Sequence, residues 1–330
     1  MKFQNAILTA LTALGLSATF ASGVAQAQTS PVFPSKTVTL VIPFTAGSGS
    51  DLISRIIAPR LSARWGQPVI VDNKPGASGN LGHSFVAKAV PDGHVLMLTA
   101  DSFAMAPAIY KSMPYDPAND FAPVLSLADA SYAFAVHPSL PAKDLKSLIA
   151  YLKANPGKVN YGTPGNGTPH HLSMELFKSA AGVDVVHVPY KGIAGALTDL
   201  MGGQVQLLYG TTNSLAPHVA SGKVRLLAIT GTARSTLVPD VATFHEQGMD
   251  AMDGGNAYYF VAAPARTSPD LVARLNTDIA AVMNASDVRA ELLKQGLTVR
   301  TGTPSQVGAA IKADLVRWRK VVTDAGITAD

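Results

Sequence analysis

Residues 37–51 read TVTLVIPFTAGSGSD, and this stretch sets the expected class of fold. Residues 37–43 are almost continuously apolar, which is the pattern of a strand buried on both faces. A loop of small residues follows and leads into residues 50–65, where apolar side chains recur at helical spacing. A buried strand joined by a short loop to a helix is the repeating unit of α/β sheets. The stretch therefore predicts an α/β fold.

The alternation of strand and helix continues along the chain. Expected strands at 68–72 and 94–99 flank an expected helix at 77–89, an order that favours a parallel sheet with crossover helices. Pro59 lies inside the first helical pattern and predicts a kink or an early end there. Further strand patterns, with helical patterns between and after them, occur at 131–137, 158–162, 183–189, 204–209, 224–230 and 257–263.

The length of the chain indicates two lobes. Its 330 residues suit two units of roughly 120–170 residues each better than one core. We expect residues 28–131 to begin the first lobe, residues 132–254 to form the second, and residues 255–330 to complete the first. The chain would then cross between the lobes twice.

The first 27 residues have the pattern of a secretory signal peptide. Lys2 provides the positive start, residues 6–20 are mostly apolar, and Ala25-Gln26-Ala27 is a small-x-small cleavage site. We expect cleavage after Ala27 and export to the periplasm; the alternative is an ordinary N-terminal helix or anchor. No later stretch reaches the roughly 18 apolar residues that a membrane helix needs.

Composition and charge exclude several classes of protein. The sequence contains no cysteine, so disulfides, thiolate catalysis, cysteine-bound metals and a lipidated N-terminal cysteine are excluded. The formal net charge is +4, and no run of lysine or arginine concentrates it. The charge pattern therefore predicts no nucleic-acid partner.

Catalytic and metal-binding motifs are incomplete. Residues 82–86 (GHSFV) miss the last position of a nucleophile elbow, and the glycine pairs at 47–49 and 165–167 lack the third glycine of a dinucleotide fingerprint. The adjacent His170 and His171 do not share a helix face, so they predict no metal site. We expect no catalytic residue, metal or cofactor. A Ser/His/Asp triad assembled only by the fold, as in a secreted hydrolase, stays open.

Two glycine-rich loops, at 45–51 and 162–168, each join the end of an expected strand to the start of a helix. Small residues let a ligand approach the backbone, and the amides and dipole of a helix N-terminus favour an anion. Two such loops facing across a cleft predict a site for a small carboxylate. Alternatively the loops are tight turns, and we expect Asp51 to cap its helix rather than contact a ligand.

The candidate ligand-binding residues come from both loops and from other strand ends. In the first loop they are Phe44, Thr45, Ala46, Gly47, Ser48, Gly49, Ser50 and Asp51. In the second loop and its helix they are Gly162, Thr163, Pro164, Gly165, Asn166, Gly167, Thr168 and His171. At the remaining strand ends they are Ser102, Tyr190, Gly210 and Thr211. Beside Tyr190, Lys191 is expected to be a solvated surface lysine.

Seven blocks, in order along the chain, resemble one family. They are FPSKTVTLVIPFTAGSGSD (33–51), VIVDNKPGASGNLG (69–82), AVPDGHVLMLT (89–99), NPGKVNYGTPGNGTPHHLSMELF (155–177), VPYKG (188–192), GKVRLLAITG (222–231) and APARTSPDLVARLN (263–276). The chain resembles the substrate-binding receptors of tripartite tricarboxylate transporters, the TctC or Bug receptors.

The resemblance implies a periplasmic-binding-protein type II fold, with two α/β lobes and a ligand cleft between them. It implies a monomeric receptor that binds a dicarboxylate, tricarboxylate, amino acid or aromatic acid and delivers it to membrane transporter subunits of the tripartite type. A ligand-loaded partner of a sensor kinase is the alternative. Two departures from the family pattern are TAGSGSD at 45–51 and Tyr258-Tyr259-Phe260, where many members have Trp, an aromatic and Gly.

Overall fold

Strand β1 (Val38–Ile42) lies inside a six-stranded sheet. The computed structural model describes residues 33–252, 255–324 and 326–327, and the segment from Pro34 onward forms one compact unit. The signal peptide expected at 1–27 lies outside the described residues. The sheet has the order β11-β4-β10-β3-β1-β2. Its other strands are β2 (Val69–Asn73), β3 (Val95–Ala100), β4 (Phe121–Ala130), β10 (Ala257–Pro264) and β11 (Thr298–Val299).

Strand directions in this first sheet are mixed. β1 pairs in parallel with β2 and β3, as the strand-helix order predicts. β10 pairs antiparallel with both β3 and β4, so a strand that begins at residue 257 lies next to one that ends at residue 100. The α/β fold class is confirmed, and the C-terminal part of the chain supplies the middle of its first sheet.

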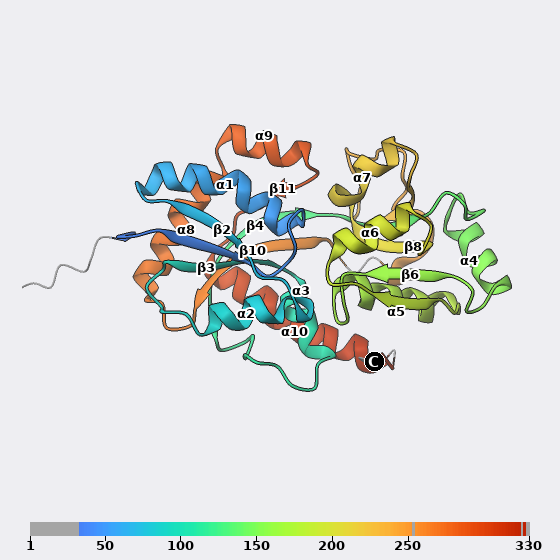
Figure 1. Cartoon of the computed structure of the whole chain (residues 1–330), viewed down its shortest axis with the longest axis horizontal. Coiled ribbons are helices and arrows are strands. Elements are labelled where there is room, and N and C mark those ends of the chain that lie inside the picture. The colour runs from blue at the N-terminus through green and yellow to red at the C-terminus, as the bar shows by residue number, and fades with distance from the viewer. Residues whose placement is uncertain (1–32, 253–254, 325, 328–330) are drawn as a thin grey trace, which may run out of the picture. The chain divides into compact units, whose positions relative to one another are not determined.

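Helices cover both faces of the first sheet (Figure 1). α1 (Gly49–Trp65) packs against α8 (Pro269–Met283) and α9 (Ser286–Lys294). On the other face, α2 (Asn80–Ala87) and α10 (Pro304–Asp324) join one apolar cluster with Val41, Met97 and Phe260 of the sheet. Successive strand residues point to opposite faces, so a strand buried on both faces must be apolar throughout.

The second sheet has five strands in the order β7-β6-β8-β5-β9. They are β5 (Tyr132–Val136), β6 (Asn160–Thr163), β7 (Val186–Pro189), β8 (Leu207–Thr211) and β9 (Arg225–Ile229). β6 pairs in parallel with β7 and β8, whereas β5 is antiparallel to β8 and β9. The helices of this part are α4 (Leu145–Ala154), α5 (Pro169–Ala181), α6 (Ile193–Met201) and α7 (Thr212–Ala220).

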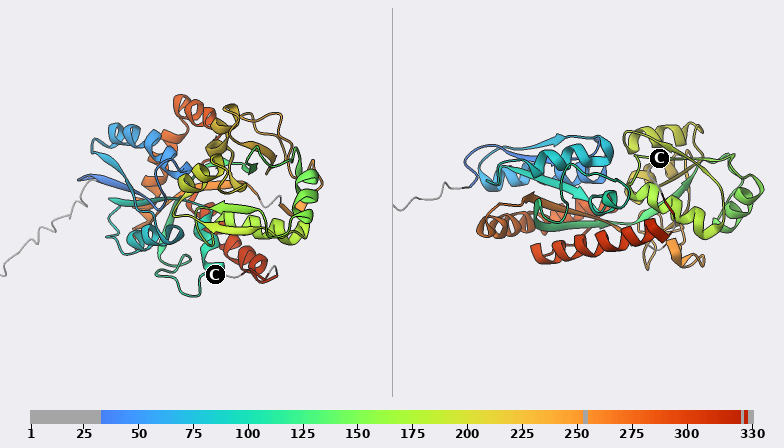
Figure 2. Two further views of the ribbon diagram at one scale, coloured as in Figure 1. Left: turned by 45° about the vertical axis from the view of Figure 1, so that its right-hand side comes forward. Right: turned by 90° about the horizontal axis from the view of Figure 1, so that it is seen from below.

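The chain passes between the sheets twice. β4 ends at Ala130 and β5 begins at Tyr132, so a single residue separates strands of different sheets. The return runs from β9 to β10. Helix α10 extends along the first sheet (Figure 2), and its Trp318 shares an apolar cluster with Leu172 of α5.

Several local expectations were wrong. β4 and β11 and the short helices were not predicted. Pro123 interrupts the strand pattern of β4, but the register of β4 with β10 shifts beside it, and a proline is tolerated at such an irregularity. Helix α1 does not end at Pro59, because Ile53, Ile57 and Leu61 are fully buried around it. The short helices are α3 (Ser102–Met105) and the 3-10 turns η1 (Ala77–Gly79), η2 (Ala106–Ala108) and η3 (Asp250–Met252).

The helix expected at 77–89 begins three residues late. Ala77 and Ser78 have positive φ values of 47° and 56°, a region that non-glycine residues rarely adopt. They form η1, and α2 starts only at Asn80. In the described part of the chain, no helix is both long and apolar enough to cross a lipid bilayer.

Candidate functional site

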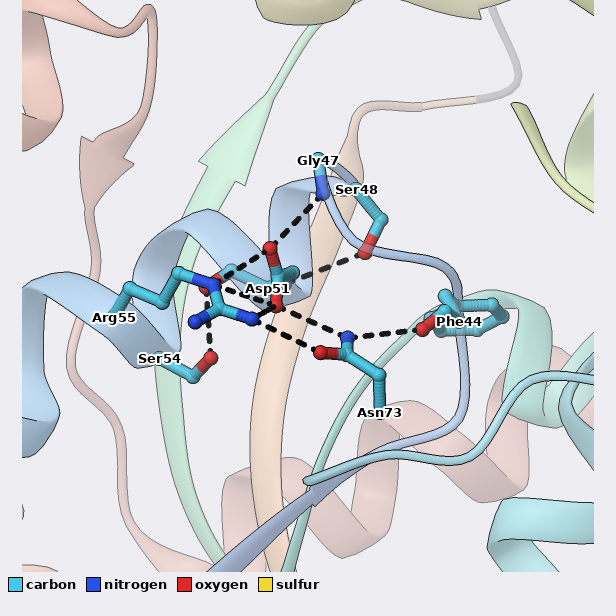
Figure 3. Close-up of polar contacts among 7 residues, drawn as sticks. All are labelled: Phe44, Gly47, Ser48, Asp51, Ser54, Arg55 and Asn73. Atoms are coloured by element: carbon cyan, nitrogen blue, oxygen red, sulfur yellow. Dashed lines mark hydrogen bonds and ion pairs between the residues drawn. The ribbon is translucent and has the colours of Figure 1, made fainter. Parts of the chain in front are cut away.

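The loop after β1 is held by the first turn of α1 (Figure 3). Ser48 is the N-cap, and its hydroxyl accepts a hydrogen bond from the amide of Asp51 at 3.3 Å. The Asp51 carboxylate reaches back and accepts from the amide of Gly47 at 2.9 Å. The cap is therefore Ser48, not Asp51, and Asp51 completes a reciprocal cap that closes the loop.

Asp51 is also the centre of a buried polar network (Figure 3). Arg55 Nε lies 3.0 Å from both carboxylate oxygens, and Asn73 Nδ2 donates to one of them at 3.0 Å. Burial by itself raises the pKa of Asp51, but the hydrogen bonds from Arg55, Gly47 and Asn73 outweigh it and hold the pKa below its ordinary value of 3.8. Asp51 is thus an ionised structural group of the loop.

A cavity of about 80 Å³ lies between residues that follow strands of the two sheets. Its wall includes an N-cap residue from each of four helices: Ser48 of α1, Thr168 of α5, Gly192 of α6 and Thr211 of α7. The first amides of a helix have no acceptor within the helix, and the helix dipole is positive at that end. The backbone around this cavity therefore favours an anion.

Four buried side-chain atoms on this wall have no hydrogen-bond partner among the described residues. They are Thr45 Oγ1, Ser50 Oγ, Ser102 Oγ and His170 Nδ1. A buried polar atom left without a partner costs on the order of 1–3 kcal/mol, so such atoms are rare unless a ligand or water completes them. Their gathering at one cavity gives its wall hydrogen-bonding groups that a polar ligand or water could satisfy.

Asp101 and Tyr132 form part of the cavity wall. The Tyr132 hydroxyl donates to the two Asp101 oxygens at 3.0 and 2.9 Å, and the amide of Ser102 donates to one of them at 2.9 Å. Burial raises the pKa of Asp101 to about 8, the hydrogen bond from Tyr132 opposes the rise, and the nearby charge of Asp314 adds to it. Burial lowers the pKa of the His170 ring to about 4. Both groups are then uncharged at pH 7.

Tyr259 brings the C-terminal part of the chain into the site. It lies on β10 and lines the cavity, and a Cβ on Gly49 would clash with its hydroxyl. A larger residue at position 49 would therefore have to displace the Tyr259 ring. Of the three residues in this segment, Tyr259, an aromatic as in the family pattern, lines the cavity. Phe260, in place of Gly, lies in the core, and Tyr258, in place of Trp, donates to Asp314 at 2.7 Å.

The predicted residues divide into two groups. Those that line the cavity are Phe44, Thr45, Ser48, Gly49, Ser50, Ser102, Pro164, Thr168 and Thr211. Those placed elsewhere are Ala46, Gly47, Asp51, Gly162, Thr163, Gly165, Asn166, Gly167, His171, Tyr190 and Gly210. Among the second group, His171 Nδ1 accepts from the amide of Gly167 at 3.3 Å, and the Tyr190 ring packs over Gly162. His171 and Tyr190 therefore support the backbone of the second loop without lining the cavity.

Several lining residues were not predicted, although they lie next to predicted ones. His170 precedes His171, Asp101 precedes Ser102, and Lys191 follows Tyr190. The sequence shows where a strand ends and so indicates the region of the site. It does not show which of two adjacent side chains there points into the cavity. Lys191 is exposed and is the one lysine or arginine on the described wall. The other unpredicted lining residues are Pro43, Pro75, Gly76, Ser78, Gly79, Ala100, Tyr132, Pro169, Gly192, Ile193, Ser214 and Tyr259.

The two halves of the cavity wall touch each other. Ser78 donates to the carbonyl of Asn166 at 2.6 Å, and Tyr110 donates to the same carbonyl at 3.2 Å. A Cβ on Gly192 would lie 2.6 Å from Thr45 Cγ2. These contacts bring the two halves of the cavity wall together. Within the ranges that the structure describes, no group of three or more His, Asp or Glu side chains is arranged to hold a metal ion.

Comparisons with known proteins agree with this architecture. Residues 53–327 match the model of the tripartite tricarboxylate transporter family receptor. BugT of Bordetella pertussis is 32% identical over 307 residues, which are 92% of this chain and 94% of that protein. A Rhodopseudomonas palustris protein solved with adipate is 35% identical with a TM-score of 0.85, over 90% of this chain and 99% of that one. MatC from the same organism, with bound malate, is 31% identical with a TM-score of 0.83, over 88% and 100%.

Replacing Asp51 with Asn should destabilise the fold by about 1–3 kcal/mol at pH 7, because a buried charge-assisted network loses its negative charge and one of its two acceptor oxygens. The pKa of Asp51 in the folded protein lies below 3.8, its ordinary value in the unfolded chain. The ionised carboxylate therefore stabilises the fold fully above pH 3.8, and this stabilisation is lost as the pH falls through the folded-state pKa. Urea unfolding at pH 7 and near pH 3 measures the gap between wild type and variant, which should shrink at the lower pH.

Asp270→Asn is the matched control, because Asp270 is an exposed acid in the first turn of α8. It should change stability by less than about 0.5 kcal/mol. An equal effect of the two substitutions, or a gap that does not depend on pH, would contradict the role given to Asp51.

Proposed function

The chain belongs to the tripartite tricarboxylate transporter receptor family, and on that premise we propose that the cavity between its two sheets captures a small organic carboxylate. One observation carries the proposal. The unpartnered Thr45, Ser50, Ser102 and His170 atoms lie on the same wall as the helix N-termini. Hydroxyls and helix-start amides are the donors that a carboxylate needs, and they bind it without a cationic side chain.

The size of the cavity favours a compact ligand. Its volume of about 80 Å³ has room for roughly five to eight water molecules, at about 10–15 Å³ each. Adipate and malate, the ligands of two similar proteins, are small dicarboxylates. We propose a ligand of this class, with one carboxylate at the start of α1.

Delivery to a membrane carrier of the tripartite type follows from the family. We propose that the receptor acts as a monomer and catalyses no reaction. Its incomplete catalytic motifs support this. The polar groups on the cavity wall are mainly hydroxyls and amides, together with the Asp101 carboxyl, the exposed Lys191 and an uncharged His170. The histidine lies in the cavity beside serines, so hydrolysis of ester substrates is the activity to assay.

We propose that the two sheets are the cores of two lobes, with the boundaries expected from the sequence. The crossings at 130–132 and 255–257 would then be the hinges, since the first has a single residue between strands of the two sheets and the second is where the chain re-enters the first sheet. The contacts of Ser78 with Asn166 and of Thr45 with Gly192 would form only in the closed state. Hinge closure of near-rigid lobes around a ligand is a common mode of capture.

Ser50→Ala and Ser102→Ala should each weaken carboxylate binding by about 10-fold or more, because a hydrogen bond to a charged group contributes roughly 1.5–3 kcal/mol. The measurement is a thermal-shift screen of mono-, di- and tricarboxylic acids, followed by calorimetry of the best ligand. Ser179→Ala is the control, since Ser179 is exposed on α5. Full affinity in both cavity variants would overturn this site.

Ligand binding should lower the radius of gyration in small-angle scattering, because the free protein is expected to sample an open state. Ser78→Ala removes the 2.6 Å hydrogen bond between the halves and should reduce both the closure and the affinity. An unchanged radius of gyration, in a sample shown by calorimetry to be saturated, would speak against a hinge.

We also propose that residues 1–27 are removed during export. Intact-mass analysis of the protein recovered from the periplasm should give Gln28 as the first residue. A mature protein that retains Lys2 would show that this segment is not a cleaved signal.

A further inference from the structure

The turn that carries Ser78 has a strained backbone. In the described part of the chain, Ala77 and Ser78 are the two non-glycine residues with positive φ values. Such a backbone persists only where the surrounding structure enforces it. The shape of this turn matters for the cavity, because Ser78 donates to the Asn166 carbonyl of the other half at 2.6 Å. Some neighbouring group must therefore hold the turn in place.

A chain of buried side chains links the residue after this turn to strand β3. Asn80 is the first residue of α2, and its Oδ1 accepts from the Tyr115 hydroxyl at 2.9 Å. His83 Nδ1 lies 2.9 Å from the same Tyr115 oxygen. On the other side of the ring, His83 Nε2 lies 2.9 Å from Thr99 Oγ1. All four residues are buried, with the most exposed at 6%.

The chain of hydrogen bonds runs in one direction. The Tyr115 hydroxyl has a single proton and gives it to Asn80, so its oxygen accepts from His83 Nδ1–H. A neutral imidazole with its proton on Nδ1 accepts at Nε2, and the Thr99 hydroxyl is the donor there. Burial lowers the pKa of His83 to about 3, which keeps the ring neutral at pH 7. Both ring nitrogens therefore have a partner.

The His83 ring also packs against the turn itself. A Cβ on Gly79 would lie 3.0 Å from His83 Cε1 and 3.2 Å from Phe44 Cε1. From other sides the ring makes edge-on contacts with Phe103 at 5.1 Å and with Tyr115 at 5.5 Å between ring centroids. The turn thus lies on a ring that is fixed by two hydrogen bonds and by aromatic packing.

The segment that contains Tyr115 also supplies the second hydroxyl at the contact between the halves. Tyr110 donates to the Asn166 carbonyl at 3.2 Å, and its hydroxyl lies 3.1 Å from Ser78 Oγ. Tyr110 and Tyr115 both lie in the connection between η2 and β4. Through Tyr115, His83 is therefore linked both to the turn and to the segment of Tyr110.

We propose that His83 is a positioning residue for ligand capture: through Tyr115 and Asn80 it holds the turn at 77–79 in the shape that presents the Ser78 hydroxyl to the Asn166 carbonyl. His83 is not among the residues that line the cavity, so it acts on a ligand through the turn. This inference rests on the proposed function and adds to it a group that sets how long the two halves stay together. Its loss should appear mainly in the dissociation rate.

The first experiment needs no ligand. Hydrogen–deuterium exchange should show protection of the Gly79 and Leu81 amides, which both donate to the Gly76 carbonyl. His83→Leu removes both hydrogen bonds of the ring and should speed exchange in peptides that cover residues 76–81 at least about fivefold. His83→Asn keeps a donor near the Nδ1 position and should restore most of the protection. Tyr115→Phe keeps its ring but not its hydroxyl, and it repeats the test if His83→Leu does not fold.

The second experiment measures binding kinetics by stopped-flow fluorescence with succinate, malate, adipate and citrate as probes. For the acid that wild-type protein binds best, His83→Leu should raise the dissociation rate about fivefold or more and leave the association rate within about threefold. In a Ser78→Ala background, the same substitution should change the dissociation rate by less than about twofold, because the Ser78 hydrogen bond is already absent.

His94→Leu is the matched control. His94 is a buried histidine that directly precedes β3, and it does not line the cavity. This substitution should leave both the exchange at residues 76–81 and the dissociation rate within about twofold of wild type. An effect as large as that of His83→Leu would show a general loss of stability and would overturn the positioning role.

The remaining outcomes separate the two levels of the proposal. Unchanged exchange at residues 76–81 in His83→Leu and Tyr115→Phe would overturn the positioning role and leave the carboxylate receptor standing. An effect of His83→Leu that is equally large with and without Ser78 would do the same. Failure of wild-type protein to bind any of the four acids, or any acid in the thermal-shift screen, would overturn the proposed function and with it the role of His83 in capture.

Discussion

The convergence of helix N-termini on one cavity is the constraint on which the site depends. Parallel strands end at a common edge of their sheet, so the helices that follow them all begin there. β1 leads into α1, while β6, β7 and β8 lead into α5, α6 and α7. Because these edges of the two sheets face the same cavity, the amides and dipoles of four helices act on one small volume. The site can then bind an anion through backbone groups and hydroxyls, with Lys191 only at its exposed margin.

Side chains on the cavity wall lie very close to glycines of other segments. Tyr259 fills the space beside Gly49, and Thr45 lies against Gly192, so each contact exists because a side chain is absent. The two positive φ values at Ala77 and Ser78 place the Ser78 hydroxyl against the Asn166 carbonyl. Local strain of this kind persists only where the surrounding structure enforces it. The contacts of Ser78 with Asn166 and of Thr45 with Gly192 join the two halves of the cavity wall, and they would break if the two halves separated.

The hydrogen-bond donors around two buried aspartates shift their pKa values in opposite directions. Asp51 has Arg55, Asn73 and the Gly47 amide within hydrogen-bond distance, and these donors lower its pKa despite burial. Among the described residues, the hydrogen-bond donors to the Asp101 carboxyl group are one hydroxyl and one amide, so burial prevails and its pKa rises. The first group is ionised and holds a loop together. The second is held by neutral donors and lines the cavity.

The sequence by itself determined the α/β class, the order of strands and helices, and the two glycine-rich loops, because hydrophobic periodicity and small residues act locally. It also located Thr45, Ser50, Ser102 and Thr168 on the cavity wall, since strand ends are visible in the pattern. Only the tertiary structure showed that β10 lies against β3, which brings Tyr259 to Gly49 across more than 200 residues of chain. The tertiary structure also placed His170 rather than His171 on the cavity wall, and it surrounded the Asp101 carboxyl group with the neutral donors Tyr132 and Ser102. Periodicity predicts which residues are buried, but the partners of a buried polar group come from distant segments, and the packing of those segments is not a local property.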